Sequence, residues 1–326
     1  MKLRIATRAS NLALVQTRWV GEQIRRHFPE LAIEEVHVRT QGDRIQDRPL
    51  AEVGGKGLFV SEVEAVVVRG AADFAVHPLK DVPGDVPLAE GMGILSVPVR
   101  EDPRDVLVTV DGTDLASLKR GARVGTTSRR RMVQFQRQRP DLGFVPLRGN
   151  IETRIRKLHE GQCDAIVLAA AGLARTGVLD ETPHSLLPPD ICLPAVGQGA
   201  LAIEGALGNE TLIEQLKSIE DPIARIQITA ERAMLQKLEG NCDSSIAGHA
   251  STRHGRLKLE AMVASYDGDQ MLSATSDTYL DLTSADAIEQ AHRLGEGVGD
   301  HLLSQGARDL IRQAELAAVQ NQLISN

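Results

Sequence analysis

Lysine and arginine residues gather in one part of the chain, residues 119–157, where twelve of them stand against two acids, Asp141 and Glu152. This segment carries a charge of +10 although the 326-residue chain carries −7, so the remaining residues are strongly acidic at −17. Charge segregated in this way indicates that the segment meets an anion. Guanidinium groups pair with carboxylates and phosphates through parallel hydrogen bonds, so a small molecule bearing several such groups fits this composition.

The arginines fall where predicted strands give way to predicted helices. The three junctions are Gly125-Thr126-Thr127-Ser128-Arg129-Arg130-Arg131, Leu147-Arg148-Gly149-Asn150 and Thr153-Arg154. A run of three arginines is usually a solvated helix face. Arg130 and Arg131, however, would lie near a helix N-terminus, where the dipole opposes cations and attracts anions. A bound anion would explain them, with each charge-assisted hydrogen bond contributing about 1.5–3 kcal/mol.

Asp81 follows Lys80 directly after a predicted buried strand at residues 73–76. An aspartate in such a place is most often a helix cap or one half of a salt bridge. At the ligand-binding edge of a sheet, among cations, its carboxylate would instead stay ionised. It would then be able to stabilise or deprotonate a positively charged centre.

The three cysteines, Cys163, Cys192 and Cys242, fit neither a disulfide framework nor a zinc site. Cys242 alone lies in a polar stretch, residues 239–245, so we expect it on a loop. A loop cysteine can be a nucleophile, an attachment point or a residue without function, and the last is the default. Asp243 beside it disfavours the thiolate. The other two are expected to be small buried apolar side chains.

A Gly-Gly-Lys-Gly stretch at residues 54–57 resembles a phosphate-binding loop but lacks the Gly-Lys-Ser/Thr ending. A mobile lid is at least as good an interpretation. Only 2% of the residues are aromatic, and the net charge is negative. Both facts disfavour a nucleic-acid binder that uses the basic segment. No apolar run reaches the length of a membrane span and the first residues lack a signal core, so we expect a soluble cytoplasmic protein.

The elements that would position these residues follow an alternating pattern. The apolar periodicity predicts strands at residues 3–6, 33–38, 73–76, 144–147 and 165–168, and helices at residues 11–27, 59–69, 128–137 and 151–158. Such alternation is typical of parallel sheets with right-handed crossovers, in which ligands bind beyond the carboxyl ends of the strands. The last third predicts a helix at residues 221–238, a hairpin of residues 257–264 and 271–278, and a helix at residues 284–303.

Taken together, these segments make the chain resemble the porphobilinogen deaminases, or hydroxymethylbilane synthases. The matching stretches run in one order from Leu3 to about Leu310: residues 4–8, Val53-Gly54-Gly55-Lys56-Gly57-Leu58-Phe59, Lys80-Asp81-Val82-Pro83, Arg100-Glu101-Asp102-Pro103-Arg104-Asp105, Leu147-Arg148-Gly149-Asn150, Ala170-Ala171-Gly172-Leu173, residues 193–200 and Glu239-Gly240-Asn241-Cys242. So many stretches in one order are far more specific than a single motif.

The resemblance implies an α/β fold with two periplasmic-binding-like α/β domains, between which the chain crosses twice, and a small C-terminal α+β domain. Domain 1 would comprise residues 1–97 and 198–218, domain 2 residues 98–197 with the anion-binding arginines, and domain 3 residues 219–326 with Cys242.

The resemblance also implies a covalent dipyrromethane cofactor, held as a thioether by Cys242. The enzyme, a transferase, would join four porphobilinogen molecules head to tail with release of ammonia, and hydrolysis would then free hydroxymethylbilane. Every pyrrole brings an acetate and a propionate, which agrees with the anion expected from the charge pattern. Neither a metal nor a nucleotide is implied, and a monomer that binds no nucleic acid or membrane is expected.

By the same resemblance, Asp81 is catalytic together with Lys80, because it would assist loss of the aminomethyl nitrogen and stabilise a positively charged pyrrole. Lys56 and Phe59 would lie on a lid. The residues expected to bind cofactor and substrate are Arg8, Ser10, Lys80, Thr126, Thr127, Ser128, Arg130, Arg131, Arg148, Gly149, Arg154, Arg175, Gln198 and Gly199.

The chain departs from the usual family pattern at Pro78, where Ser is common, and at Arg129, where an apolar residue is common. Around Cys242, Asn241 and Ser245 replace the usual Gly and Pro, but the thiol is retained. The main alternative is a non-catalytic, two-lobed anion-binding protein. The expected lack of a secretion signal and the Cys242 loop argue against it.

Overall fold

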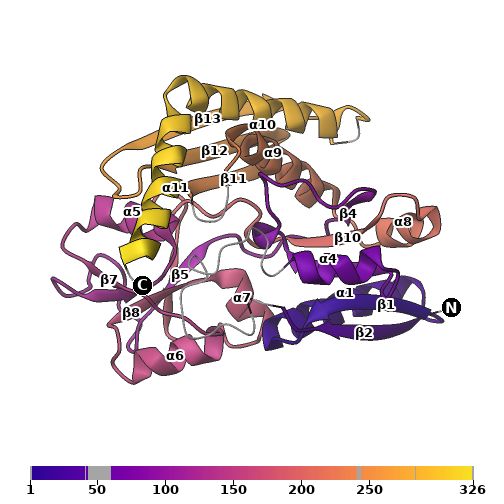
Figure 1. Cartoon of the computed structure of the whole chain (residues 1–326), viewed down its shortest axis with the longest axis horizontal. Coiled ribbons are helices and arrows are strands. Elements are labelled where there is room, and N and C mark those ends of the chain that lie inside the picture. Colours follow the sequence, from indigo (N-terminus) through magenta and orange to yellow (C-terminus); the bar gives the residue numbers. More distant parts are fainter. Residues whose placement is uncertain (1, 41, 43–59, 241–243, 283, 325–326) are drawn as a thin grey trace.

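The computed structural model describes residues 2–40, 42, 60–240, 244–282 and 284–324 and has three sheets. In Figure 1 two α/β lobes lie side by side below the third sheet. The fold predicted from the sequence, two α/β units and a small α+β unit, is confirmed by these sheets and the helices packed on them. Within the described residues, no helix is both long and apolar enough to cross a membrane.

The first lobe is a five-stranded sheet in the order β2-β1-β3-β10-β4. Its strands are β1 (Lys2–Arg8), β2 (Ala32–Val38), β3 (Phe74–Pro78), β4 (Met92–Ser96) and β10 (Leu201–Ala206). Its helices are α1 (Asn11–His27), α4 (Ser61–Val68) and α8 (Glu210–Lys217), and a 3-10 turn, η1 (Leu79–Asp81), follows β3.

The second lobe repeats this pattern in the order β7-β6-β8-β5-β9. Its strands are β5 (Asp105–Val108), β6 (Arg123–Gly125), β7 (Gly143–Val145), β8 (Ala165–Ala169) and β9 (His184–Leu187). Its helices are α5 (Arg129–Gln138), α6 (Ile151–His159) and α7 (Ala170–Arg175).

The third unit is a three-stranded antiparallel sheet made of β11 (Ser245–Arg253), β12 (Arg256–Ala264) and β13 (Met271–Tyr279). Helices α9 (Pro222–Leu238), α10 (Ala287–Ser304) and α11 (Ala307–Ile324) accompany it. Its core is aliphatic, and α9, α10 and α11 contribute to it together with the strands.

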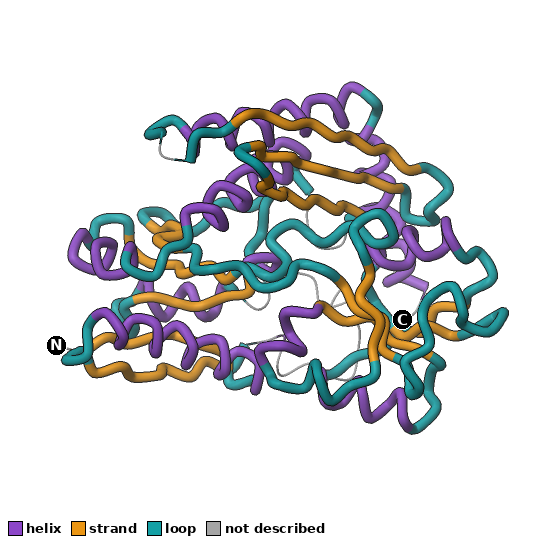
Figure 2. The backbone as a smooth tube through the Cα atoms, turned by 180° about the vertical axis from the view of Figure 1, so that it is seen from behind, coloured by secondary structure: helices purple, strands orange, loops and turns teal. Residues whose placement is uncertain are grey.

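The expectation of purely parallel sheets is wrong. Each lobe has four strands in one direction and one reversed strand, β10 in the first lobe and β5 in the second. Both reversed strands come directly after the chain has crossed from one lobe to the other, at residues 97–104 and 188–200. A chain that arrives from the other lobe enters the sheet at the edge where the parallel strands end, so it must run against them. Figure 2 shows loops crossing the middle of the molecule between the lobes.

Candidate active site

The carboxyl ends of the parallel strands bring most of the predicted site residues to one region between the lobes. Arg8 ends β1, Lys80 and Asp81 follow β3, and Arg175 ends the helix that follows β8. The two lobes touch here, because the Asn11 amide donates to Glu152 Oε1 at 2.7 Å. Sheet topology thus assembles residues that are far apart in the chain.

The centre of this region is a carboxylate that sequence reasoning missed. Asp105, the first residue of β5, is fully buried and accepts from Arg131 Nη2 at 2.6 Å and from Arg130 Nη1 at 2.8 Å. Arg131 also donates to the Val167 carbonyl at 2.8 Å. Burial alone would raise the pKa of Asp105, but the charges of Arg130 and Arg131 hold it well below its usual range.

Asp105 therefore accounts for the two buried arginines without a bound anion. Two arginines on one carboxylate still leave one positive charge uncompensated, which a ligand could neutralise. The role of Arg130 and Arg131 toward a ligand therefore stays a prediction. The sequence signal for Asp105 is a charged residue that opens an otherwise apolar strand, Asp105–Val108.

Lys80 and Asp81 lie beside this cluster, since the charges of Arg131, Asp105 and Arg130 all act on Lys80. Both side chains are half-buried, and neither forms a hydrogen bond or ion pair with any residue that the structure describes. Burial lowers the pKa of the Lys80 ammonium to about 8. The charge of Asp81 raises this pKa and the charge of Arg131 lowers it, each by less than burial does. A half-buried lysine and aspartate that form no hydrogen bond or ion pair within the described part of the chain are available to a ligand.

Arg154 is a second cation without a carboxylate in the described part of the chain. Its Nε donates to the Gly149 carbonyl at 2.8 Å. Burial, with the nearby charges of Arg131 and Arg148, lowers the pKa of Arg154 to about 10. Gly149 has a φ of 116°, and a Cβ there would lie 2.6 Å from Thr153, so the turn that offers this carbonyl requires glycine.

At the N-terminus of α5, the N-cap side chain does not cap the helix. Ser128 occupies the N-cap position, but its side chain makes no capping hydrogen bond. The buried Thr126 hydroxyl accepts from the Ser128 N–H at 3.1 Å instead, and Thr127 is exposed. A hydroxyl and the first amides of a ten-residue helix are thus left beside the arginines, which suits an anion.

Ser10, in contrast, caps α1, because its hydroxyl accepts from the Ala13 N–H at 3.4 Å. The crossing segment at residues 188–200 closes the region on another side. The Gly199 carbonyl accepts from Arg175 Nη2 at 2.7 Å and from the Glu101 N–H at 3.1 Å. Gly199 has a φ of 88°, and a Cβ would lie 2.4 Å from the Glu101 carbonyl oxygen, so only glycine fits.

Gln198 holds the same segment to the Asp105 cluster. Its Nε2 donates to Asp105 Oδ1 at 3.0 Å and to the Pro103 carbonyl at 2.7 Å. Cys192, expected to be a simple buried apolar side chain, is buried but also donates to Asp105 Oδ2 at 3.3 Å. That part of the prediction is corrected, since the thiol belongs to the polar cluster.

Arg129, one of the departures from the usual family pattern, has a partner in the third unit. Its guanidinium lies over the Tyr266 ring, 3.6 Å from the centroid, and also donates to the Tyr266 hydroxyl. The contact joins the start of α5 to the turn between β12 and β13. Cation–π packing across this junction gives the arginine a structural reason.

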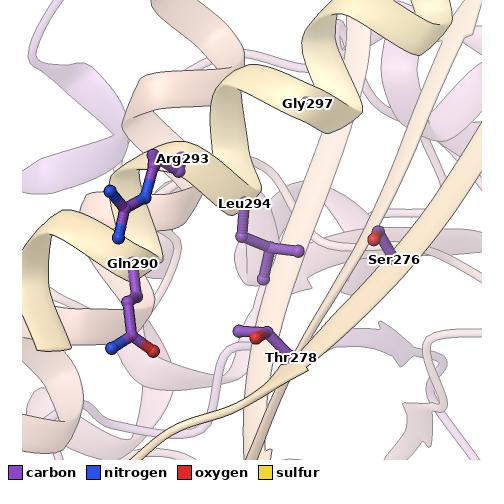
Figure 3. Close-up of a pocket in the computed structure, with 6 residues that line it drawn as sticks. All are labelled: Ser276, Thr278, Gln290, Arg293, Leu294 and Gly297. Carbon is purple, nitrogen blue, oxygen red and sulfur yellow. The ribbon is translucent and has the colours of Figure 1, made fainter.

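Three predicted residues, Cys242, Lys56 and Phe59, lie outside the described residues. The described residues contain no cluster of His, Cys, Asp or Glu suited to a metal ion. A hollow of about 480 Å³ between α10 and β13 is lined by six residues, none of which belongs to the predicted site: Ser276, Thr278, Gln290, Arg293, Leu294 and Gly297 (Figure 3).

Comparisons with known proteins cover almost the whole chain. The family model for the "Porphobilinogen deaminase, dipyromethane cofactor binding domain" matches residues 3–214, and the model for the "Porphobilinogen deaminase, C-terminal domain" matches residues 225–304. Among solved structures, the probable amino-acid ABC transporter extracellular-binding protein ytmK from Bacillus subtilis covers 67% of this chain and 90% of its own, at 7% identity and a TM-score of 0.41. That likeness is too distant to add to the fold assignment.

Three curated relatives are porphobilinogen deaminases. The protein of Syntrophobacter fumaroxidans is 46% identical over 95% of this chain and 97% of its own length. The proteins of Brevibacillus brevis and Geobacter metallireducens are 45% and 43% identical, each over 96% of this chain and over 97% and 94% of their own lengths. With two family models that together span the lobes, the cationic region between them and the third unit, the chain belongs to the porphobilinogen deaminase family.

Proposed function

We propose that the protein is a transferase that joins four porphobilinogen molecules head to tail, releases ammonia at each addition, and hydrolyses the chain from a dipyrromethane primer as hydroxymethylbilane. The observation that carries this proposal is the group of cations around Lys80, next to Asp81, that lack a full set of carboxylates among the residues that the structure describes. Membership of the family supplies the identity of the anion.

The donor set suits dipyrromethane and a growing chain of pyrroles, each with two carboxylates. Burial and like charges depress the pKa values of Lys80 and Arg154, and a bound carboxylate would relieve both effects. Ser128 offers a hydroxyl that is not used to cap its helix. We assign binding of cofactor and substrate to Arg8, Ser10, Lys80, Thr126, Thr127, Ser128, Arg130, Arg131, Arg148, Gly149, Arg154, Arg175, Gln198 and Gly199.

Asp81 is the proposed catalytic carboxylate. Departure of the substrate's aminomethyl nitrogen leaves positive charge on the pyrrole, and the negative charge of a carboxylate beside it would stabilise that charge. Lys80 beside it binds a substrate carboxylate through its ammonium group. A protein that only binds anions would gain nothing from a carboxylate beside its cations, so Asp81 favours catalysis over the alternative of a non-catalytic binding protein.

Cys242 is the proposed attachment point of the cofactor, as a thioether, and Lys56 and Phe59 are proposed lid residues. When bound, dipyrromethane supplies the pyrrole carbon to which the first substrate unit is joined. This chain's own residues hold the carboxylates and keep the reacting pyrrole beside Asp81. The two crossing segments limit the access of water to this place.

The division into domains also remains a proposal: residues 1–97 with 198–218, residues 98–197, and residues 219–326. It is supported by the three sheets and by the two crossings of the chain between the lobes. We further propose that the protein is a cytoplasmic monomer that binds neither nucleic acid nor membrane, as its net charge of −7 and small-molecule substrate suggest.

The test is turnover of porphobilinogen by the purified protein. We expect one ammonia released for each porphobilinogen consumed, and a linear tetrapyrrole as the product. Binding of porphobilinogen without release of ammonia by cofactor-loaded protein would contradict catalysis and support the non-catalytic alternative.

A further inference from the structure

The Asp105 carboxylate cannot meet a ligand itself. Asp105 is fully buried, and its strand is paired on both sides, with Ala169 of β8 and Leu187 of β9 opposite it. A residue held so firmly moves little relative to the sheet. Any part that it plays in the reaction must therefore act through the groups that it holds.

Those groups come from two separate segments and occupy both carboxylate oxygens. Oδ1 accepts from Arg131 Nε at 3.1 Å, from Arg131 Nη2 at 2.6 Å and from Gln198 Nε2 at 3.0 Å. Oδ2 accepts from Arg130 Nη1 at 2.8 Å and from Cys192 Sγ at 3.3 Å. A carboxylate has about four lone-pair sites, so this one is fully used. The cluster thereby fixes helix α5 against the crossing segment.

Arg130 is held along one side only. Its Nη1 donates to Asp105 and, at 2.6 Å, to the Leu193 carbonyl, whereas Nε and Nη2 have no acceptor among the described residues. The side chain is only 6% exposed. Neither nitrogen is among the fully buried polar atoms that lack a partner, so both keep some contact with solvent, and another molecule can supply their acceptor. A carboxylate would match the fork that Nε and Nη2 present.

Cys192 supplies the donor that completes Oδ2 without adding charge. Burial and then Asp105 raise the pKa of its thiol to about 12, so the thiol keeps its proton at any working pH. The sulfur also lies 3.6 Å from Arg130 Nη1, which places it against both members of the ion pair. A serine at this position would donate in the same way, whereas an alanine would not.

We propose that Asp105 and Cys192 are positioning residues of the anion site, which orient Arg130 so that its Nε and Nη2 meet a substrate carboxylate. This inference rests on the proposed function and adds to it two groups that do not contact the substrate. The thiol limits the rotation of the Asp105 carboxylate, and the carboxylate in turn fixes the guanidinium of Arg130.

The test compares Cys192→Ala with Cys192→Ser in the cofactor-loaded protein. Loss of one neutral hydrogen bond is expected to raise KM for porphobilinogen about fivefold, equivalent to about 1 kcal/mol, with kcat changed less than about twofold. The serine variant should restore KM to near the wild-type value. Cys163→Ala is the matched control, because Cys163 is buried in the same lobe and makes no polar contact with the cluster. This variant should lower stability without changing KM.

An unchanged KM in Cys192→Ala, or an equal defect in Cys192→Ser or Cys163→Ala, would overturn the positioning role, since packing alone would then explain the data. A crystal structure of Cys192→Ala gives a readout that does not depend on turnover. Displacement of the Arg130 guanidinium is expected, and an unmoved guanidinium contradicts the proposal. If the wild-type protein consumes no porphobilinogen, the proposed function fails, and this crystal structure still decides whether Cys192 positions Arg130.

Discussion

Two buried carboxylates, Asp105 and Glu231, organise different parts of the molecule. Asp105 holds two arginines at the edge of the second lobe. Glu231, in α9 of the third unit, holds one, Arg100, at 2.7 Å, and accepts from the N–H groups of Gly197 and Ala250, each at 2.7 Å. Burial would raise the pKa of Glu231, but Arg100 and then His249 hold it at about 2.

The clusters around the two carboxylates differ in net charge. Glu231 and Arg100 neutralise each other, and the remaining bonds tie both crossing segments to β11, so this cluster is a structural junction. The Asp105 cluster keeps one excess positive charge, and Lys80 and Arg154 lie near it. A balanced cluster stabilises the fold, whereas an unbalanced one prepares a place for an anion. Asp81 follows Lys80 directly and therefore lies beside this second cluster, where it forms no hydrogen bond or ion pair with the described residues.

The largest effect expected is on turnover in Asp81→Asn. The amide keeps the shape but loses the negative charge, so kcat should fall at least about 100-fold. Because Asp81 has no partner among the described residues, the unfolding temperature should hardly change. Steady-state kinetics and thermal unfolding measure the two, and near-normal turnover would remove Asp81 from the mechanism.

Glu231→Gln should do the opposite, with a large loss of stability and little change in KM. Leaving Arg100 buried without its carboxylate is expected to cost about 3–5 kcal/mol. Since folding lowers the pKa of Glu231, its contribution is complete above the unfolded-state pKa of about 4.3 and disappears as pH falls through about 2. Denaturant unfolding at several pH values measures this, and equal stability of the variant and wild type at pH 7 would contradict a structural junction.

Arg154→Gln tests the cationic site, as Glu231→Gln tests the structural junction. Losing one carboxylate contact should raise KM about tenfold, while stability should stay the same or rise because repulsion from Arg131 and Arg148 is relieved. Arg156→Gln is the control on the same helix, since Arg156 is exposed and paired with Glu160. Equal KM values in the two variants would show that Arg154 does not bind the substrate.

For Lys80 we expect a smaller effect on KM that depends on pH. Its ammonium group loses its proton near pH 8 in the folded protein, so KM should rise above that pH, by about fivefold at pH 9. Folding lowers the pKa of Lys80, so over the same range stability should rise slightly with pH. Lys80→Arg should flatten the pH profile of KM, because arginine stays charged. A wild-type profile that is already flat would exclude Lys80 as a binding group.

Local signals in the sequence predicted local structure well. Helix α1 was predicted with its actual bounds, residues 11–27, because Ser10 caps one end and Pro29 follows the other. The helices after the basic junctions, α5 and α6, were also predicted, since apolar periodicity and caps lie within a few neighbouring residues.

Two features that the sequence did not predict, the direction of β10 and the buried ion pairs, depend on residues far away in the chain. Nothing in the run Leu201–Ala206 indicates that β10 is reversed, because direction depends on where the chain comes from. The ion pairs of Asp105 with Arg131 and of Glu231 with Arg100 join residues 26 and 131 positions apart. The arginines were singled out by charge, but only the fold shows that Asp105 holds two of them.

The most direct test of the account is the intact mass of the denatured, purified protein, with Cys242→Ser as the control. We expect an excess equal to two linked pyrrole units in the wild type and none in the variant. A bare chain mass after incubation with porphobilinogen would contradict the account, because no primer would then be attached to Cys242.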